Sequence, residues 1–270
     1  MNESFYFLLA LSFLVGSIWV TLTSIAAERF GSKIGGLIGG LPSTVIVSFF
    51  FIGLTQSPQT ASLATNVFPL AYSVTGLFLV FYALFSKKGF AFSFISSLLI
   101  WFSLSALIIL FDINNFLISL LAYALAFSIS YIILEKRLKI PSTGRIKMNY
   151  SPLQIFGRAV FSGMMIAFAV FMSRVGGPIF GGIFSAFPAV FISILIISYR
   201  SRGMDFSRAM TKPLMTTGML SIVAYGTAVR FLYPSFGLIA GTVGAYIISL
   251  AGAYISYVVF QKTDIKNGSA

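Results

Sequence analysis

Long apolar stretches of the chain alternate with short breaks that contain charged or turn-forming residues. Most of these stretches are close to the length of about 20 residues that a helix needs to cross a bilayer. The pattern therefore predicts nine membrane-spanning helices. They run roughly over residues 4–27, 34–54, 63–85, 90–111, 115–134, 153–173, 175–198, 209–232 and 236–260.

Two predicted joints are short, one beginning at Asp112 and the other at Ser173-Arg174, and the charges decide whether they separate helices. With nine spans, sixteen of the 18 lysines and arginines fall on one side, and only Arg174 and Arg230 fall on the other. An excess of basic residues marks the cytoplasmic side. We therefore expect a multi-pass protein of the cell (inner or plasma) membrane, with its N-terminus outside and its C-terminus in the cytoplasm.

The composition agrees with a membrane protein, because 58% of the 270 residues are hydrophobic and only 9% are charged. A soluble domain carries about 25% charged residues. The topology accounts for the net charge of +12, so nucleic-acid binding is not needed to explain it. The chain has no cysteine and no histidine, which excludes disulfides and imidazole metal sites. We find no catalytic set, no metal cluster and no cofactor motif, and an enzyme is the least favoured class.

An internal repeat relates the two halves of the chain. Segments 31–42 and 177–188 share the pattern G-x-x-x-G-G, two apolar residues, two small residues, an apolar residue and proline, at a constant offset of 146. Spans 1–4 and 6–9 then form two units with span 5 as the connector, which inserts the units in opposite orientations. The predicted fold is an all-α membrane protein of about nine helices arranged as 4+1+4 inverted-topology repeats, an architecture common in transporters. The expected boundaries are 1–114, 115–152, 153–262 and a tail at 263–270.

The second unit resembles the small four-span GlpM-like bacterial membrane proteins over about 100 residues. The resemblance rests on segment 181–191, which reads GGIFSAFPAVF, and on the polar turn at 200–212. The first unit departs from this pattern, with Gly40-Leu-Pro-Ser-Thr around its proline. The resemblance implies a fused, antiparallel pair of such units, and it implies a fold rather than a substrate.

The repeated glycines have the small-xxx-small spacing that lets helices approach closely in lipid. One interpretation is that spans 2 and 7 simply pack against each other. The residues assigned to this helix packing are Gly31, Gly35, Gly36, Gly177, Gly181 and Gly182.

The repeated prolines favour a second interpretation, in which both spans are broken in mid-membrane. Proline lacks an N–H and disturbs the carbonyl four residues earlier, and irregular backbone at this depth is tolerated where it packs on protein or lines a wet cavity. Ser43 and Thr44 add hydroxyl groups beside the first proline. The predicted solute path consists of Ile38, Gly39, Gly40, Pro42, Ser43, Thr44, Phe184, Ser185, Pro188 and Arg158.

Arg158 precedes an apolar run too short to span the bilayer alone, so its side chain either reaches the inner surface or faces protein within the membrane. Its repeat mate is Ser12, so the repeat does not require arginine here.

The first functional hypothesis is a transporter of a small neutral or anionic solute that works by alternating access between the two repeats. No carboxylate lies in a predicted span, which disfavours acid-based proton coupling and organic cations. The alternatives are an ion channel with its pore at the crossing of spans 2 and 7, and a non-transporting membrane assembly factor. The expected partners are the lipid bilayer and a small solute or ion, with a homo-oligomer left open, and neither a cofactor nor nucleic acid.

Overall fold

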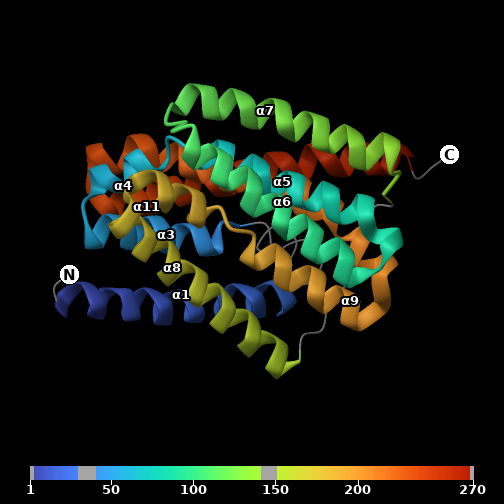
Figure 1. The fold of residues 1–270 in the computed structure, drawn as a ribbon, viewed down its shortest axis with the longest axis horizontal. Coiled ribbons are helices and arrows are strands. Elements are labelled where there is room, and N and C mark those ends of the chain that lie inside the picture. Colours follow the sequence, from blue (N-terminus) through green and yellow to red (C-terminus); the bar gives the residue numbers. More distant parts are fainter. Residues whose placement is uncertain (1–2, 30–40, 141–150, 268–270) are drawn as a thin grey trace.

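The computed structural model describes residues 3–29, 41–140 and 151–267, and every regular element in these ranges is a helix (Figure 1). The first half contains α1 (Glu3–Arg29), α3 (Ser43–Thr55), α4 (Pro58–Ala64), α5 (Phe68–Phe85), the short turn η1 (Ser86–Lys88) and α6 (Phe90–Leu110). The connector is α7 (Phe116–Ile132) with a π-helical turn η2 (Ile133–Arg137). The second half contains α8 (Pro152–Ser185), α9 (Ala189–Ala209), α10 (Thr211–Pro213), the π-helical turn η3 (Leu214–Gly218) and α11 (Met219–Asn267).

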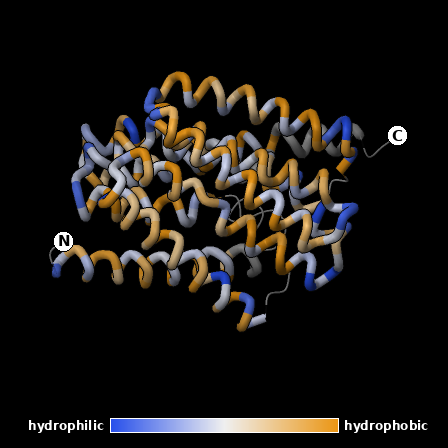
Figure 2. Tube along the Cα trace, in the orientation of Figure 1, coloured by the Kyte–Doolittle hydropathy of each residue, from blue (hydrophilic) through white to orange (hydrophobic). Residues whose placement is uncertain are grey.

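Six helical stretches in these ranges are long and apolar enough to cross a membrane. Their outer surfaces are apolar as well: Leu110, Leu153 and Ile239 are each more than 75% exposed. Figure 2 shows hydrophobic residues along the length of the long helices and the most hydrophilic residues near their ends. Such a surface is compatible with a helical, multi-pass membrane protein.

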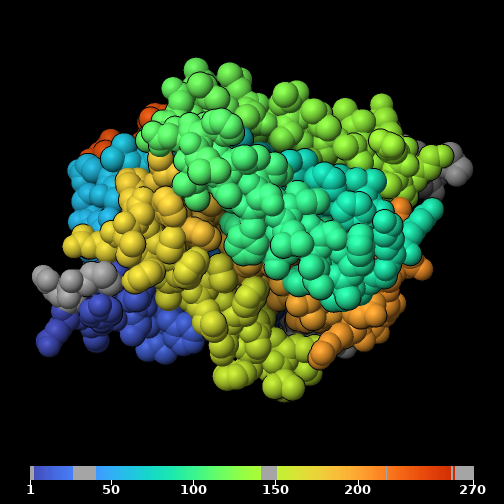
Figure 3. Space-filling model, viewed as in Figure 1, coloured from blue at the N-terminus to red at the C-terminus, as the bar shows by residue number. Residues whose placement is uncertain are grey.

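The helices form a core and a shell. Of the most apolar 18-residue stretch that begins in α5, 72% is buried inside the protein, against 22% of the corresponding stretches of α1 and α7. Most residues of α3 are buried too. The space-filling view shows α6 and α7 covering a large part of one face (Figure 3). The segments that carry the two repeated prolines therefore lie next to the most buried part of the molecule.

Helix α8 reverses direction at Gly177, where φ is 81° and ψ is −175°. Glycine adopts this backbone conformation without the strain that a Cβ would add. Beyond the turn, Gly181 lies against Ser173: a Cβ built on Gly181 would sit only 2.6 Å from the Cβ of Ser173. Eight residues of straight helix would hold these two residues about 12 Å apart. The chain therefore folds back on itself at a single residue.

Two further reversals use glycine in the same conformation, with φ of 82° at Gly203 in α9 and 74° at Gly237 in α11. Across Gly203, the Ser207 hydroxyl donates to the Leu195 carbonyl at 2.8 Å. Across Gly237, the hydroxyls of Tyr233 and Thr242 are hydrogen-bonded at 2.8 Å. Helices α9 and α11 thus each consist of stretches that fold back without a connecting loop.

Of the two short joints predicted from the sequence, the structure confirms one and displaces the other. The joint after Asp112 is confirmed, since α6 ends at Leu110 and α7 begins at Phe116. The joint at Ser173-Arg174 is wrong by a few residues, because the helix continues to the reversal at Gly177. Arg174 stays helical with an exposed side chain, and its guanidinium carbon lies 6.0 Å from the centre of the Phe5 ring. A charge near the end of a span did not mark the turn itself.

Polar contacts tie the helices together at both ends of the molecule. At the end that holds most of the basic residues, Lys212 Nζ lies 2.7 Å from Glu135 Oε2, which joins the second half to the connector. At the opposite end, the Ser62 hydroxyl donates to the Arg230 carbonyl at 2.7 Å, and the Arg230 side chain donates to Asn66. The first and second halves are therefore joined directly at that end.

Candidate functional site

Both repeated prolines sit at the same backbone turn. Pro42 has φ −75° and ψ 55°, and Pro188 has φ −77° and ψ 41°. The next residue in each case, Ser43 or Ala189, donates its N–H to the residue before the proline at 2.8 Å. This is the inverse γ-turn pattern, and a helix begins directly after it, α3 in one case and α9 in the other.

The second turn interrupts what the sequence predicts as one span, 175–198. The arm of α8 beyond Gly177 ends at Ser185, and α9 begins at Ala189. Broken helices of this kind leave polar backbone groups at membrane depth, and protein contacts or a polar cavity must satisfy them.

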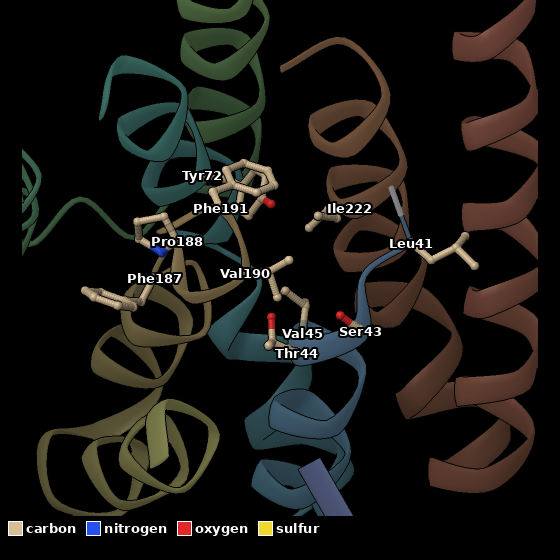
Figure 4. A pocket seen from close by; sticks show the side chains of 10 residues that line it. All are labelled: Leu41, Ser43, Thr44, Val45, Tyr72, Phe187, Pro188, Val190, Phe191 and Ile222. Atoms are coloured by element: carbon tan, nitrogen blue, oxygen red, sulfur yellow. The ribbon is translucent and has the colours of Figure 1, made fainter. Parts of the chain in front are cut away.

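A pocket lies between the two turns (Figure 4). The space between atoms there is about 340 Å³, a figure that includes open solvent, and the enclosed part of it is small. Its walls come from the start of α3, from α5, from the turn before α9 and the start of α9, and from α11. The lining residues are Leu41, Ser43, Thr44, Val45, Tyr72, Phe187, Pro188, Val190, Phe191 and Ile222.

Three pairs of lining residues stand at the repeat offset of 146. These pairs are Leu41 with Phe187, Thr44 with Val190, and Val45 with Phe191. Corresponding residues of the two halves thus meet at one place. The two sides differ in polarity, because Ser43 and Thr44 carry hydroxyls where Ala189 and Val190 carry none.

The polar side chains of the lining are hydroxyls. Ser43 is 7% exposed and Tyr72 is 4% exposed, and neither side chain has a hydrogen-bond partner within the described ranges. Figure 4 shows the oxygen atoms of Ser43, Thr44 and Tyr72 turned toward the space between the two turns. None of the lining residues that the structure describes is charged. Such hydroxyls can both donate to a bound molecule and accept from it.

The carbonyl groups at the second turn already have partners. The Thr75 hydroxyl donates to the Ala186 carbonyl at 2.6 Å and accepts from Trp101 Nε1 at 3.0 Å. The Phe184 carbonyl, which Pro188 disturbs, accepts from the Phe187 N–H at 3.2 Å. These carbonyls therefore do not need a solute or a water molecule to satisfy them.

The structure brings together some of the path residues predicted from the sequence and not others. Ser43, Thr44 and Pro188 line the pocket, and Pro42 is buried beside it. Phe184 instead packs edge-on against Phe168, with ring centres 4.9 Å apart. The hydroxyl of Ser185 is buried without a hydrogen-bond partner among the described residues. Predicted path residues Ile38, Gly39 and Gly40 lie outside the described residues.

Arg158 does not line the pocket. It lies in the first turns of α8, and its side chain is only 8% exposed, so it faces protein. The structure therefore does not bring this arginine together with the hydroxyl groups of the path.

The glycines assigned to helix packing divide into two kinds. A Cβ on Gly181 would lie 3.2 Å from Ile52 of α3 as well as against Ser173, and a Cβ on Gly182 would overlap the backbone of Ala64 in α4. Both glycines therefore sit at close helix contacts. The packing assignment of Gly177 is wrong, because nothing lies within 4 Å of its Cβ position and its positive φ makes the reversal. Gly31, Gly35 and Gly36 lie outside the described residues.

Tyr72 and Ile222 are pocket residues that the sequence pattern did not reveal. Both lie on helices that are apolar on all sides, so periodicity does not show which face points inward. Tyr72 stands one turn after Pro69, in a helix that also contains Tyr82, and nothing in the sequence separates the two tyrosines.

Comparison with known proteins gives one match. Residues 9–116 are similar to a family described as "Protein of unknown function (DUF3147)". The match runs from α1 to the first residue of α7, in the half that departs from the GlpM-like pattern, so the resemblance of the second half to GlpM-like proteins stays a prediction. No curated protein and no solved structure matches the chain.

Proposed function

We propose that this protein is a membrane transporter of a small neutral or anionic solute, and that the pocket between the Pro42 and Pro188 turns is its binding site. One observation carries the proposal. Two helices that begin at the same kind of turn meet around a partly open space, and the hydroxyls of two largely buried residues, without partners in the described ranges, face that space. A pocket of this kind between the halves of a repeat is where transporters of inverted-repeat architecture bind their solutes.

The inverted repeat itself is part of the proposal. The reversals at Gly177, Gly203 and Gly237 divide the two longest apolar stretches into shorter ones, which supports nine crossings. The family match over 9–116 nearly coincides with the first proposed unit, 1–114, which supports treating this half as a unit. With one connecting span between them, the units face in opposite directions.

The proposed orientation places the N-terminus outside and the C-terminus in the cytoplasm. The ion pair of Lys212 with Glu135, and the hydrogen bond of 3.1 Å from Arg208 to the Leu138 carbonyl, gather the basic connector and the basic part of the second half at one end. The positive-inside rule assigns such an end to the cytoplasm.

The pocket is built from both halves, which suits alternating access. Ser43, Thr44 and Tyr72 belong to the first half, and Phe187 and Ile222 belong to the second. A tilt of one half against the other would open the space between the two turns first to one side of the membrane and then to the other.

Uptake by liposomes that contain the purified protein tests this function. A panel of neutral and anionic solutes is offered to vesicles with the wild-type chain and with the double variant Ser43→Ala, Thr44→Val. We expect the double variant to change the order of preference among solutes while it unfolds at nearly the wild-type temperature.

Ser128→Ala is the matched control. Ser128 is exposed on α7, and its hydroxyl bonds to the Ala124 carbonyl within its own helix, so uptake should not change. If the double variant loses thermal stability but transports at the wild-type rate per folded molecule, the hydroxyls are structural and the binding site lies elsewhere.

A further inference from the structure

Two helices point their N-terminal ends at the pocket. Thr44 and Val45 from the first turn of α3, and Val190 and Phe191 from the first turn of α9, are lining residues. Neither helix has a side chain that caps its N-terminus. The partial positive charge of a helix N-terminus, about half an elementary charge, therefore faces the pocket from both sides.

The backbone N–H groups at these ends are unevenly paired. In α9, Ala189 and Ile192 donate to the carbonyls of Phe187 and Pro188, both at 2.8 Å. Between them, the N–H groups of Val190 and Phe191 have no acceptor among the described residues.

Helix α3 repeats this arrangement. Ser43 and Ile46 donate to the carbonyls of Leu41 and Pro42 at 2.8 and 2.9 Å. The N–H groups of Thr44 and Val45 have no acceptor in the described part of the chain. Each helix thus leaves two backbone donors without an acceptor, and all four belong to residues that line the pocket.

The side chains supply an independent indication of a ligand. The hydroxyls of Ser43 and Tyr72 belong to residues that are more than nine-tenths buried, lack partners within the described ranges, and point into the same space (Figure 4). Each of these two hydroxyl oxygens keeps some accessible surface, so it can form a hydrogen bond with a molecule in the pocket. Such groups, added to four backbone donors, describe a site that is rich in donors and has few acceptors.

We propose that the pocket binds a small organic monoanion, a carboxylate with a short apolar tail. This inference rests on the proposed function, because it names the solute class of the same site. Two helix ends of about half a charge each balance one negative charge, and no lysine or arginine among the described lining residues would balance a second. A cation would face both positive ends. The apolar side chains of Phe187, Phe191 and Ile222 cover the rest of the wall, which favours contact with an apolar tail over contact with hydration water.

Three probes of similar size or charge separate the possibilities. Pyruvate is a carboxylate that stays ionised near neutral pH, pyruvamide is its uncharged counterpart, and chloride is an inorganic monoanion. Binding to the purified full-length protein is measured as thermal stabilisation, and uptake is measured separately in liposomes. We expect pyruvate to bind at least tenfold more tightly than pyruvamide or chloride.

Two variants remove single donors. Tyr72→Phe deletes one hydroxyl. Val190→Pro deletes one backbone N–H in the first helical turn, where proline is tolerated and where this chain already carries Pro69 in α5. Each variant should weaken pyruvate binding about ten- to hundredfold, as expected for one lost hydrogen bond to a charged group. Leu117→Pro, at the matching position of α7 and away from the pocket, should leave binding unchanged.

The outcomes separate this inference from the transporter itself. If pyruvamide or chloride binds as tightly as pyruvate, the carboxylate assignment is wrong. If the liposomes nevertheless take up pyruvamide, the proposed transport function is still supported. Pyruvate binding that the Tyr72 variant weakens, without any uptake, supports the anion site and contradicts transport. If Val190→Pro fails to fold, Tyr72→Phe decides alone, and unchanged pyruvate affinity in that variant overturns the assignment.

Discussion

Thr75 shows how single hydroxyl groups satisfy the buried backbone of this molecule. Its hydroxyl joins the indole N–H of Trp101 to the carbonyl of Ala186, and both Thr75 and Trp101 are fully buried. Thr75→Val keeps the shape and leaves both partners without a hydrogen bond. We expect a loss of about 2 kcal/mol in the free energy of unfolding, measured by thermal or denaturant unfolding in detergent.

Thr23→Val is the control for this prediction. The Thr23 hydroxyl donates only to carbonyls of its own helix, those of Trp19 and Val20. Those carbonyls belong to the regular helix α1, so their backbone hydrogen bonds remain and stability should hardly change. Equal losses of unfolding free energy in the two variants would show that the Thr75 bridge stabilises the fold no more than a hydrogen bond within one helix does.

The pair of Lys212 and Glu135 supports a second prediction at this scale. Both side chains are largely buried, with exposed fractions of 8% and 20%. Glu135→Gln removes the negative charge and leaves the buried ammonium group without it, so we expect a loss of about 3 kcal/mol in stability. Unfolding of the single variant and of the double variant with Lys212→Met is the measurement. The double variant should recover much of the loss, and equal instability of both would contradict the ion-pair argument.

At the residue scale, the sequence predicted the two prolines and the hydroxyls of Ser43 and Thr44 as neighbours of a site, because their repeat is visible in the order of residues. It did not predict where the helices resume: α3 and α9 both begin directly after the proline turn, and Pro42 and Pro188 would also fit a turn inside a longer broken helix.

At the scale of the element, single glycines with positive φ reverse the direction of helices α8, α9 and α11. Gly203 has φ 82°, and nothing lies within 4 Å of the position where a Cβ would stand. Any cost of Gly203→Ala must therefore come from the backbone rather than from a clash. We expect this variant to lose about 1 to 3 kcal/mol of stability, measured as a lower unfolding temperature in detergent.

Gly157→Ala is the matched variant. Gly157 also has open space around its Cβ position, but it lies in the regular part of α8 and has no positive φ. Alanine should be neutral or slightly stabilising there. If both variants behave alike, the reversal at Gly203 does not depend on glycine.

The same elements show why the sequence placed one joint wrongly. Gly177 and Gly181 have the spacing of packing glycines, and only Gly181 packs closely. The property that separates them is the value of φ at Gly177, which residue spacing does not encode. The charge of Arg174 also led to a joint placed too early, because Arg174 lies three residues before the turn and remains helical.

On the scale of the whole molecule, the uneven distribution of charge predicts the orientation in the membrane. In this cysteine-free chain, single cysteines at Gln59, Ser142 and Ser269 give a clean test. An impermeant thiol reagent added to intact cells should label Gln59→Cys, which is exposed on α4, and should leave Ser142→Cys and Ser269→Cys unlabelled.

Permeabilised cells provide the control, because all three variants should then react. Labelling of Ser142→Cys in intact cells would reverse the proposed orientation. At this scale the sequence predicted a helical membrane protein and a meeting of the two proline segments. It could not predict the helices that complete the pocket, because α5 and α11 carry apolar residues on their outward faces as well as on their inward faces.

The unequal walls of the pocket have a consequence for the orientation of any molecule bound there. If both turns carried the same side chains, a bound molecule would have two poses of equal energy, related by exchange of the two halves. Ser43 and Thr44 carry hydroxyls where their repeat mates Ala189 and Val190 carry only methyl groups, so the two poses would differ in energy. A single chain that fuses two related halves can therefore give an unsymmetrical molecule one preferred orientation, which two identical subunits could not do.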